Sequence, residues 1–299
     1  MVNKMEAGFS LALRNSTVGI FGLGLMGGSL AMRLKGHCRT LIGFDSHLPT
    51  LELALSKNII DHAESFPPLP QGEGLGVREL HQVDLLILAV PVPSIINILQ
   101  QLPAFMPNPC IVLDLGSTKQ NIVQAMSALP ERFDPIGGHP ICGKEKLGLE
   151  NADPNLYQDA PFVTTPLERT TQLAKSSVTQ LISTIGARLI EMTAPDHDRI
   201  LASTSHLPFL LSSALAHSSP QEFSSLIGPG FRSASRLAGT PSRMMIGILK
   251  SNRENILNAI QNFRNSLNEI ESALQNENDA QLELLLNQSR AAYQSLTKN

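Results

Sequence analysis

The stretch Gly22-Leu23-Gly24-Leu25-Met26-Gly27 decides the fold of this chain. It has the spacing G-x-G-x-x-G and follows a short apolar run, Val18 to Phe21, that predicts a buried strand. In such a motif the first glycine makes a tight turn, the second lets a pyrophosphate approach the backbone, and the third lets a helix pack on the strand. The cofactor phosphates are expected at the N-terminus of the following helix. The expected cofactor-binding residues here are Gly22, Gly24, Leu25, Met26 and Gly27.

A carboxylate stands where the ribose of a dinucleotide would need one. A second apolar run, Thr40 to Phe44, ends at Asp45, which lies 18 residues beyond Gly27. This is near the spacing of an acid that binds a ribose 2′-hydroxyl. We therefore expect Asp45 to bind NAD, with NADP as the alternative cofactor. An ordinary glycine turn is the competing interpretation, and the strand, the spacing and the acid together disfavour it.

Length and composition bound the class of protein. The 299 residues, of which 42% are hydrophobic, are enough for two domains with buried cores. The net charge of −3 argues against a nucleic-acid or membrane-surface partner. No apolar run approaches the roughly 20 residues of a membrane span. The cysteines, Cys38, Cys110 and Cys142, have neither metal-ligand spacing nor a disulfide pattern. We expect a cytoplasmic protein without a metal site.

Strands and helices alternate along the first part of the chain. Residues 84–90 and 110–115 are continuous apolar runs, typical of parallel strands covered on both faces. Pro91 ends the first of them, and Ser94 is expected to cap the helix that follows. The pattern predicts an α/β fold with a Rossmann-type, doubly wound parallel sheet, which binds ligands at the carboxyl ends of its strands. Val90 and Pro91 are accordingly expected to contact the cofactor.

Domain boundaries are predicted where this alternation of strands and helices begins and ends. We expect a tail over residues 1–16, a dinucleotide-binding domain over 17–192 and a helical substrate-binding and dimerisation domain over 193–299. Segment 66–77 is rich in proline and glycine, which predicts a disordered surface insertion. No strand pattern appears after Thr193.

The C-terminal third shows apolar residues at helical spacing. One stripe runs from Ile200 to Leu215 and is expected to form a single helix, and another runs from Ile256 to Leu274. Long apolar stripes are usually a core or a subunit seam rather than a ligand site. We therefore predict an all-helical domain that makes the protein a homodimer.

The candidate chemistry lies in a cluster at 137–148, which contains His139 after a Gly-Gly turn. An imidazole there could accept a proton near neutral pH, although a lone histidine is more often structural. Downstream, Arg232 and Arg236 follow the turn Gly228-Pro229-Gly230. Paired guanidinium groups suit a small dicarboxylate, and solvated surface arginines are the alternative.

Cys142 is a second candidate for reactivity. It lies three residues after His139, with Lys144 and Lys146 nearby. Neighbouring cations can lower the pKa of a thiol and make it nucleophilic, so we hypothesise a reactive Cys142. A small buried thiol that never reacts is the alternative.

Taken together, these residues resemble the prephenate/arogenate dehydrogenase family of tyrosine biosynthesis. The resemblance runs from Val18 to about Leu274 apart from the insertion, and we therefore expect neither a mutase nor a regulatory module in this chain. It rests on the glycine motif and on these further motifs: Leu-Ala-Val-Pro at 88–91, Asp-Leu-Gly-Ser-Thr-Lys at 114–119, Gly-Gly-His-Pro-Ile-Cys-Gly at 137–143, Ser-His-Leu-Pro at 205–208, Gly-Phe-Arg at 230–232 and Ser-Arg-Leu-Ala at 235–238.

The resemblance implies an oxidative decarboxylation in which a hydride leaves the substrate for NAD(P)⁺, CO₂ departs and the ring becomes aromatic. It implies that His139 is the base for the C4 hydroxyl and that Ser117 orients this hydroxyl. Arg236 is implied to hold a substrate carboxylate. The remaining residues implied to bind prephenate or arogenate are Glu145, His206 and Gly230.

The sequence also departs from the family pattern. Phe209 replaces a second histidine found in some prephenate-specific members, which leaves the choice of substrate open. Gly247 stands where an acid is common. Two alternatives to this function remain: a β-hydroxy-acid dehydrogenase with Lys250 as its catalytic lysine, or a dinucleotide sensor without turnover. A sensor would need no base such as His139.

Overall fold

The apolar runs of the N-terminal part form one sheet. The computed structural model describes residues 12–66, 82–144 and 146–297. Within them, an eight-stranded sheet has the order β3-β2-β1-β4-β5-β6-β7-β8. Its strands are β1 Thr17–Phe21, β2 Thr40–Asp45, β3 His62–Ser65, β4 Leu85–Leu88, β5 Cys110–Asp114, β6 Phe133–Pro140, β7 Pro161–Pro166 and β8 Arg188–Glu191.

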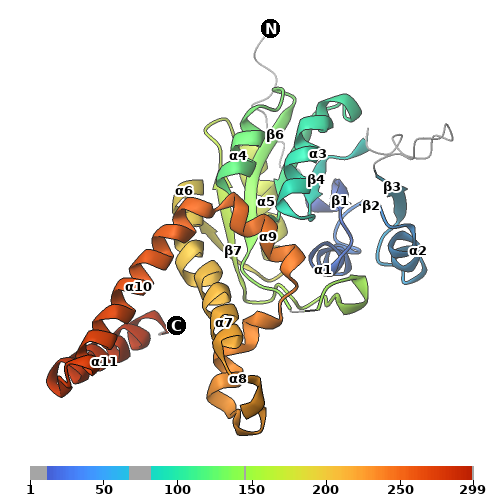
Figure 1. Cartoon of the computed structure of the whole chain (residues 1–299). Coiled ribbons are helices and arrows are strands. Elements are labelled where there is room, and N and C mark those ends of the chain that lie inside the picture. Colours follow the sequence, from blue (N-terminus) through green and yellow to red (C-terminus); the bar gives the residue numbers. More distant parts are fainter. Residues whose placement is uncertain (1–11, 67–81, 145, 298–299) are drawn as a thin grey trace.

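Helices cover both faces of this sheet (Figure 1). One face is packed by α1 Leu25–Leu34, α2 Leu48–Ser56 and α5 Gln172–Thr184. The other face is packed by α3 Val92–Phe105 and α4 Gln120–Ser127. Strands β1, β2, β4 and β5 are almost fully buried, as expected for parallel strands between two helical layers. The predicted doubly wound fold is confirmed.

The sheet departs from parallel pairing at one place. Strands β1 to β6 pair in parallel, but β7 runs antiparallel to β6, and β8 is parallel to β7. A parallel neighbour requires a crossover, usually an α-helix. The described part of the connection between β6 and β7 contains only a short 3-10 turn, Leu149–Asn151, so β7 returns in the opposite direction.

After β8 the described chain is helical. Its elements are α6 Ala194–Leu201, a π-helical turn Ala202–His206, α7 Leu207–Ser218, α8 Pro229–Ser235, a 3-10 turn η6 Arg236–Gly239, α9 Ser242–Ser251, α10 Arg253–Gln275 and α11 Asp279–Leu296. Helices α10 and α11 pack as a hairpin that projects away from the sheet (Figure 1). No helix in the described residues is long and apolar enough to cross a membrane.

The single helix predicted from Ile200 to Leu215 contains a π-helical turn, so that prediction was incomplete. The N–H of Leu207 bonds to the carbonyl of Ala202, five residues earlier. The next residue, Pro208, has no N–H to continue the regular ladder. The wider turn shifts the helix faces, and Ile200 and Leu215 are exposed although they belong to the apolar stripe.

Other local predictions have mixed outcomes. Helix α3 begins at Val92 directly after Pro91, so the predicted cap by Ser94 was wrong. The described end of the expected tail, residues 12–16, packs on the domain: Leu13 is buried in the core, and its N–H donates to Gln180 at 3.1 Å. The predicted insertion lies outside the described residues except for Phe66, whose ring packs edge-on against Phe21.

Candidate active site

The glycine motif forms the turn between β1 and α1. Gly22 has φ +88°, and a Cβ there would lie 2.6 Å from a side-chain methyl carbon of Val90. A Cβ on Gly27 would lie 1.8 Å from the carbonyl oxygen of Gly22, so any side chain would push α1 off the strand. Nothing lies within 4 Å of the same position on Gly24. Gly24 therefore leaves open space directly before the N-terminus of α1 at Leu25, as a pyrophosphate needs.

A cavity of about 500 Å³ opens beside this turn. Its lining includes Gly22, Gly24, Asp45, Val90, Pro91 and Arg243. Arg243 comes from the helical part, near the start of α9, and is exposed. The cavity is therefore lined by a cation from the helical part and by the Asp45 carboxylate from the sheet.

Asp45 also holds the glycine turn in place. One of its carboxylate oxygens accepts the N–H of Leu23 at 2.8 Å, and the other accepts the N–H of His47 at 2.9 Å. Each carboxylate oxygen can accept more than one hydrogen bond. Asp45 can thus fix the turn and still accept a ribose hydroxyl.

His139 and Ser117 share the carboxyl edge of the sheet. His139 is the penultimate residue of β6, and Ser117 lies in the loop that follows the neighbouring parallel strand β5. Both residues are half-buried. The N–H of Gly138 donates to Asp114 Oδ1 at 3.1 Å, which ties the backbone next to His139 to the end of β5.

A buried ion pair lies beneath His139. The side chains of Asp114 and Lys119 are both fully buried, and Lys119 Nζ donates to Asp114 Oδ2 and, at 2.6 Å, to the carbonyl of Gly138. Burial shifts the pKa of Asp114 upward and that of Lys119 downward, and the attraction between the two charges opposes both shifts. The pair thus ties the end of β5 to the strand that carries His139.

His139 is the first member of a chain of polar side chains. Its Nδ1 lies 2.8 Å from His197 Nε2, and His197 Nδ1 lies 2.8 Å from Asp198 Oδ1. His197 and Asp198 belong to α6, the first helix after the sheet. Burial lowers the pKa of His139 well below its usual value, and the nearby His197, Lys119 and His206 lower it further. A neutral His139 can accept a proton.

His206 ends the π-helical turn and is buried beside the same cluster. Asn252 Nδ2 lies 3.2 Å from His206 Nδ1 and donates to the carbonyl of Asp198 at 2.6 Å. Burial lowers the pKa of His206 to about 4. Because an amide nitrogen can only donate, Nδ1 of His206 is the acceptor and its Nε2 carries the hydrogen.

The other predicted substrate residues lie elsewhere. Gly230 lies in α8 and Arg236 begins η6; both are exposed, and these elements pack mainly against α7. Glu145 lies outside the described residues. The structure thus gathers His139, Ser117 and His206 at the junction of sheet and helices and leaves Arg236 on the helical side.

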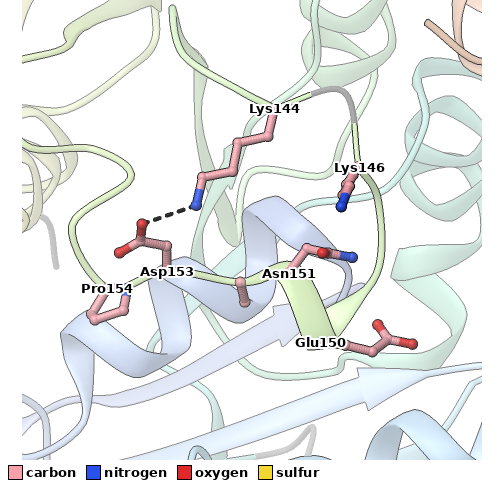
Figure 2. A pocket seen from close by; sticks show the side chains of 7 residues that line it. Lys144, Lys146, Glu150, Asn151, Asp153 and Pro154 are labelled. Atoms are coloured by element: carbon pink, nitrogen blue, oxygen red, sulfur yellow. Dashed lines mark hydrogen bonds and ion pairs between the residues drawn. The ribbon is translucent and has the colours of Figure 1, made fainter. Parts of the chain in front are cut away.

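The loop after β6 carries a second cavity, of about 490 Å³ (Figure 2). Lys144 and Asp153 line it and form an ion pair at 2.9 Å, and the N–H of Asp153 donates to Ser29 of α1.

Nearby Cys142 does not match the reactive thiol that we hypothesised. Burial raises its pKa to about 11, so the predicted lowering by neighbouring cations was wrong. Among the described residues, no group of three or more His, Cys, Asp or Glu side chains could hold a metal ion.

Comparisons with known proteins agree along nearly the whole chain. Residues 29–191 match the family model "Prephenate dehydrogenase, nucleotide-binding domain", and residues 193–288 match "Prephenate dehydrogenase, dimerization domain". The chain belongs to the prephenate dehydrogenase family. The prephenate dehydrogenase of Lactococcus lactis is 32% identical over 263 residues, which cover 84% of this chain and 69% of the relative.

Solved structures of this family have the same fold. Prephenate dehydrogenase from Aquifex aeolicus, in complex with hydroxyphenyl propionate and NAD⁺, superposes with a TM-score of 0.83 at 27% identity, covering 94% of this chain and 98% of the other. Synechocystis arogenate dehydrogenase superposes with a TM-score of 0.76 at 27% identity, covering 94% of this chain and all of the other.

Reasoning from the sequence missed several residues of this junction. One sequence pattern could have pointed to His197 and Asp198: a histidine stands between two acids just where the predicted strands end and the helices begin. No such pattern points to Asn252 or Arg243. Their places depend on how α9 and α10 pack against the sheet.

Proposed function

We propose that this chain is an NAD-dependent dehydrogenase that oxidatively decarboxylates prephenate to 4-hydroxyphenylpyruvate, or arogenate to tyrosine. Membership of the prephenate dehydrogenase family over both of its parts supports this activity. The observation that carries it is the half-buried imidazole of His139, whose pKa is lowered, at the sheet edge that also holds the dinucleotide turn.

The residues present suit a dinucleotide. The turn from Gly22 to Gly27 would hold the pyrophosphate, Asp45 would bind the adenosine ribose, and Val90 and Pro91 would contact the cofactor from the cavity lining. When bound, the nicotinamide supplies the acceptor for the hydride that leaves C4 of the substrate. NAD is the proposed cofactor, and NADP is the second candidate because Arg243 reaches the same cavity.

His139 would be the base that removes the proton of the C4 hydroxyl. As C4 becomes a carbonyl carbon, His139 Nε2 takes this proton. Departure of the ring carboxylate as CO₂ then makes the ring aromatic and leaves its electron pair on the phenolate oxygen. His139 returns the proton to that oxygen, so the base is regenerated and no net proton is consumed. A base of lowered pKa is available for this step at neutral pH.

The remaining substrate contacts are assigned by charge. Ser117 follows the neighbouring strand and would orient the C4 hydroxyl. The Nε2–H of His206 is a neutral donor for a substrate carboxylate. Arg236 and Gly230, on the helical part, would bind the second carboxylate, and Glu145 is the remaining residue that the family resemblance implies for substrate binding.

The choice between prephenate and arogenate depends on the ammonium group that only arogenate carries. Phe209 brings neither a charge nor a hydrogen-bond donor to α7. An acid at Glu145 would favour the ammonium of arogenate, and Lys144 would favour the keto acid prephenate. The two substrates are therefore compared directly in the test below.

A β-hydroxy-acid dehydrogenase is the weaker candidate. Its expected lysine, Lys250, is exposed near the C-terminal end of α9. The lysine beside His139 is instead Lys119, which is fully buried and paired with Asp114. Lys119 has no exposed surface with which to contact a substrate, and its Nζ already donates to Asp114 and to the carbonyl of Gly138.

We further propose that the protein is a homodimer. The family model over residues 193–288 describes a dimerization domain. Large apolar side chains of α10 and α11 are exposed in the single chain, among them Leu267 (49%), Leu274 (60%) and Tyr293 (67%). Covering them with a second copy would remove this apolar area from water.

The test is an assay of the purified chain with NAD⁺ and either prephenate or arogenate. Reduced cofactor is followed by absorbance, and the aromatic product and CO₂ are quantified in the same samples. We expect one mole of each per mole of reduced cofactor with at least one substrate. Oxidation of a β-hydroxy acid without turnover of either cyclohexadiene would refute the proposal.

A further inference from the structure

His197 and Asp198 are buried side chains at the junction of the two parts, and the family resemblance assigns them no role. Both are 0% exposed, and both come from α6, whereas His139 comes from β6. We propose that His197 and Asp198 are positioning residues that hold His139 in the tautomer with a bare Nε2. Docking of the helical part would then set the base in the nucleotide-binding part. This inference rests on the function proposed above.

The chain of polar contacts starts at Asp198, whose carboxylate oxygens act only as acceptors. Oδ1 accepts the N–H of Lys119 at 2.7 Å, and Oδ2 accepts the N–H of Gln120 at 2.9 Å. These N–H groups begin α4, where the helix dipole favours a negative charge. Burial alone would raise the pKa of Asp198, but hydrogen bonds from His197, Gln120 and Lys119 outweigh it and hold the pKa below its usual value. Asp198 is therefore an ionised acceptor.

The hydrogen positions of both imidazoles follow from this carboxylate. Since Asp198 can only accept, the hydrogen of His197 lies on Nδ1, which is 2.8 Å from Oδ1. With Nε2 of His197 bare in the proposed arrangement, His139 Nδ1 donates to it across 2.8 Å. The remaining nitrogen of His139, Nε2, carries no hydrogen. It is the nitrogen that takes the hydroxyl proton in the proposed reaction.

The surrounding charges make this tautomer matter. The groups that face His139 are Lys119 from the start of α4, His197 from α6 and His206 from the π-helical turn, and all of them disfavour a second proton on its ring. Asp198 supplies the opposing negative charge through His197. When His139 accepts the substrate proton, its Nδ1–H still donates to His197, so the charged ring keeps its orientation.

The same contacts join the two parts of the chain. Asp198 binds the start of α4, and its backbone carbonyl accepts from Asn252 at the start of α10. The site of the base and the docking of the helices therefore depend on one carboxylate. A histidine held by the sheet alone would be free to rotate its ring or to change tautomer.

Two substitutions of His197 separate orientation from packing. Glutamine places an acceptor and a donor in line, so His197→Gln can accept from His139 and donate to Asp198. His197→Phe fills the space but offers neither group. We expect His197→Phe to lower kcat by about 10²–10⁴-fold, as loss of the right tautomer does in a catalytic triad. His197→Gln should stay within about 10-fold of the parent. KM and NAD⁺ affinity should change little in both, and His217→Gln, on an exposed face of α7, is the matched control.

The direct readout is ¹⁵N NMR of histidine-labelled protein, which distinguishes a protonated from a bare ring nitrogen. We expect a bare Nε2 and a protonated Nδ1 for His139 in the parent and in His197→Gln, with assignment from the signal lost in His139→Asn. A hydrogen on Nε2 of His139 in the parent would overturn the inference, as would equal kcat values for the Gln and Phe variants.

The NMR result needs no substrate, so it also decides the inference if His197→Phe does not fold. For the same reason, failure of the parent to oxidise prephenate and arogenate would refute the proposed function without deciding the tautomer.

Discussion

Removing the charge of Lys119 tests the buried support beneath the base most sharply. Lys119→Met preserves length and apolar packing but leaves the Asp114 carboxylate without its cation. Breaking a buried ion pair by removing one partner costs about 3–5 kcal/mol, because the remaining charge stays buried and uncompensated. The N–H groups of Gly116 and Gly138 still donate to Asp114, at 2.7 and 3.1 Å, so the loss should lie toward the lower end of that range.

The double variant Asp114→Asn, Lys119→Met provides the comparison. It carries no buried charge at this place and keeps a side chain of similar size at each position. We expect the double variant to lose less free energy of unfolding than Lys119→Met alone, although two destabilising substitutions would ordinarily add. The coupling should exceed about 1 kcal/mol, which neighbouring residues in one network commonly reach.

Urea unfolding of the parent, the two single variants and the double variant, followed by circular dichroism, measures these differences. Equal slopes in denaturant are the control that the extent of unfolding has not changed. If Lys119→Met unfolds within about 1 kcal/mol of the parent, the ion pair does not support the sheet and the reasoning from burial fails.

Further predictions concern chemistry and assembly. His139→Asn should lower kcat by about 10²–10⁴-fold with little change in KM. A near-normal kcat in this variant would make the histidine structural. Arg236→Ala should mainly raise KM, through loss of a charge-assisted bond worth about 1.5–3 kcal/mol. Protonated His139 cannot act as a base, and its pKa is lowered well below 6.5. The parent should therefore keep its kcat/KM through pH 6.5 and lose it only in more acid buffer. A half-maximal kcat/KM at pH 6.5 would contradict the lowering of this pKa by burial. NAD⁺ should have a lower KM than NADP⁺, and Arg243→Ala should raise the KM for NADP⁺ more than that for NAD⁺; an unchanged ratio would mean that the guanidinium does not reach the ribose phosphate. Leu267→Asp should convert a dimer into monomers in light scattering, and an unchanged mass would place the seam elsewhere.

The sequence alone was sufficient for the elements whose cause is local. The apolar runs predicted β1, β2, β4 and β5, because burial on both faces leaves a continuous apolar signature. The glycine motif predicted its turn because the steric reason for each glycine lies within a few residues. The antiparallel β7 was not predicted, since strand direction depends on how a long connection crosses α1.

The site was predictable only where a motif carried it. His139 and Ser117 follow strand ends, and the parallel sheet brings such residues to one edge. The π-helical turn that places His206 has a visible cause, Pro208, but a helical stripe does not reveal the shift in register. His197 lies 58 residues from His139 along the chain, and no local pattern announces a contact over that separation.

The hydrogen bonds of Asp198 explain why base and helices cannot vary independently. The carboxylate binds the start of α4 and the ring of His197 at the same time, through oxygens that lie 2.7–2.9 Å from their donors. A substitution of Asp198 would therefore release α6 from α4 and free the tautomer of His139 in one step, and its kinetic effect could not be assigned to either cause. The ring of His197 bonds to Asp198 on one side and to His139 on the other. Variation at His197 is thus the place where orientation of the base can be changed while the helical part stays docked.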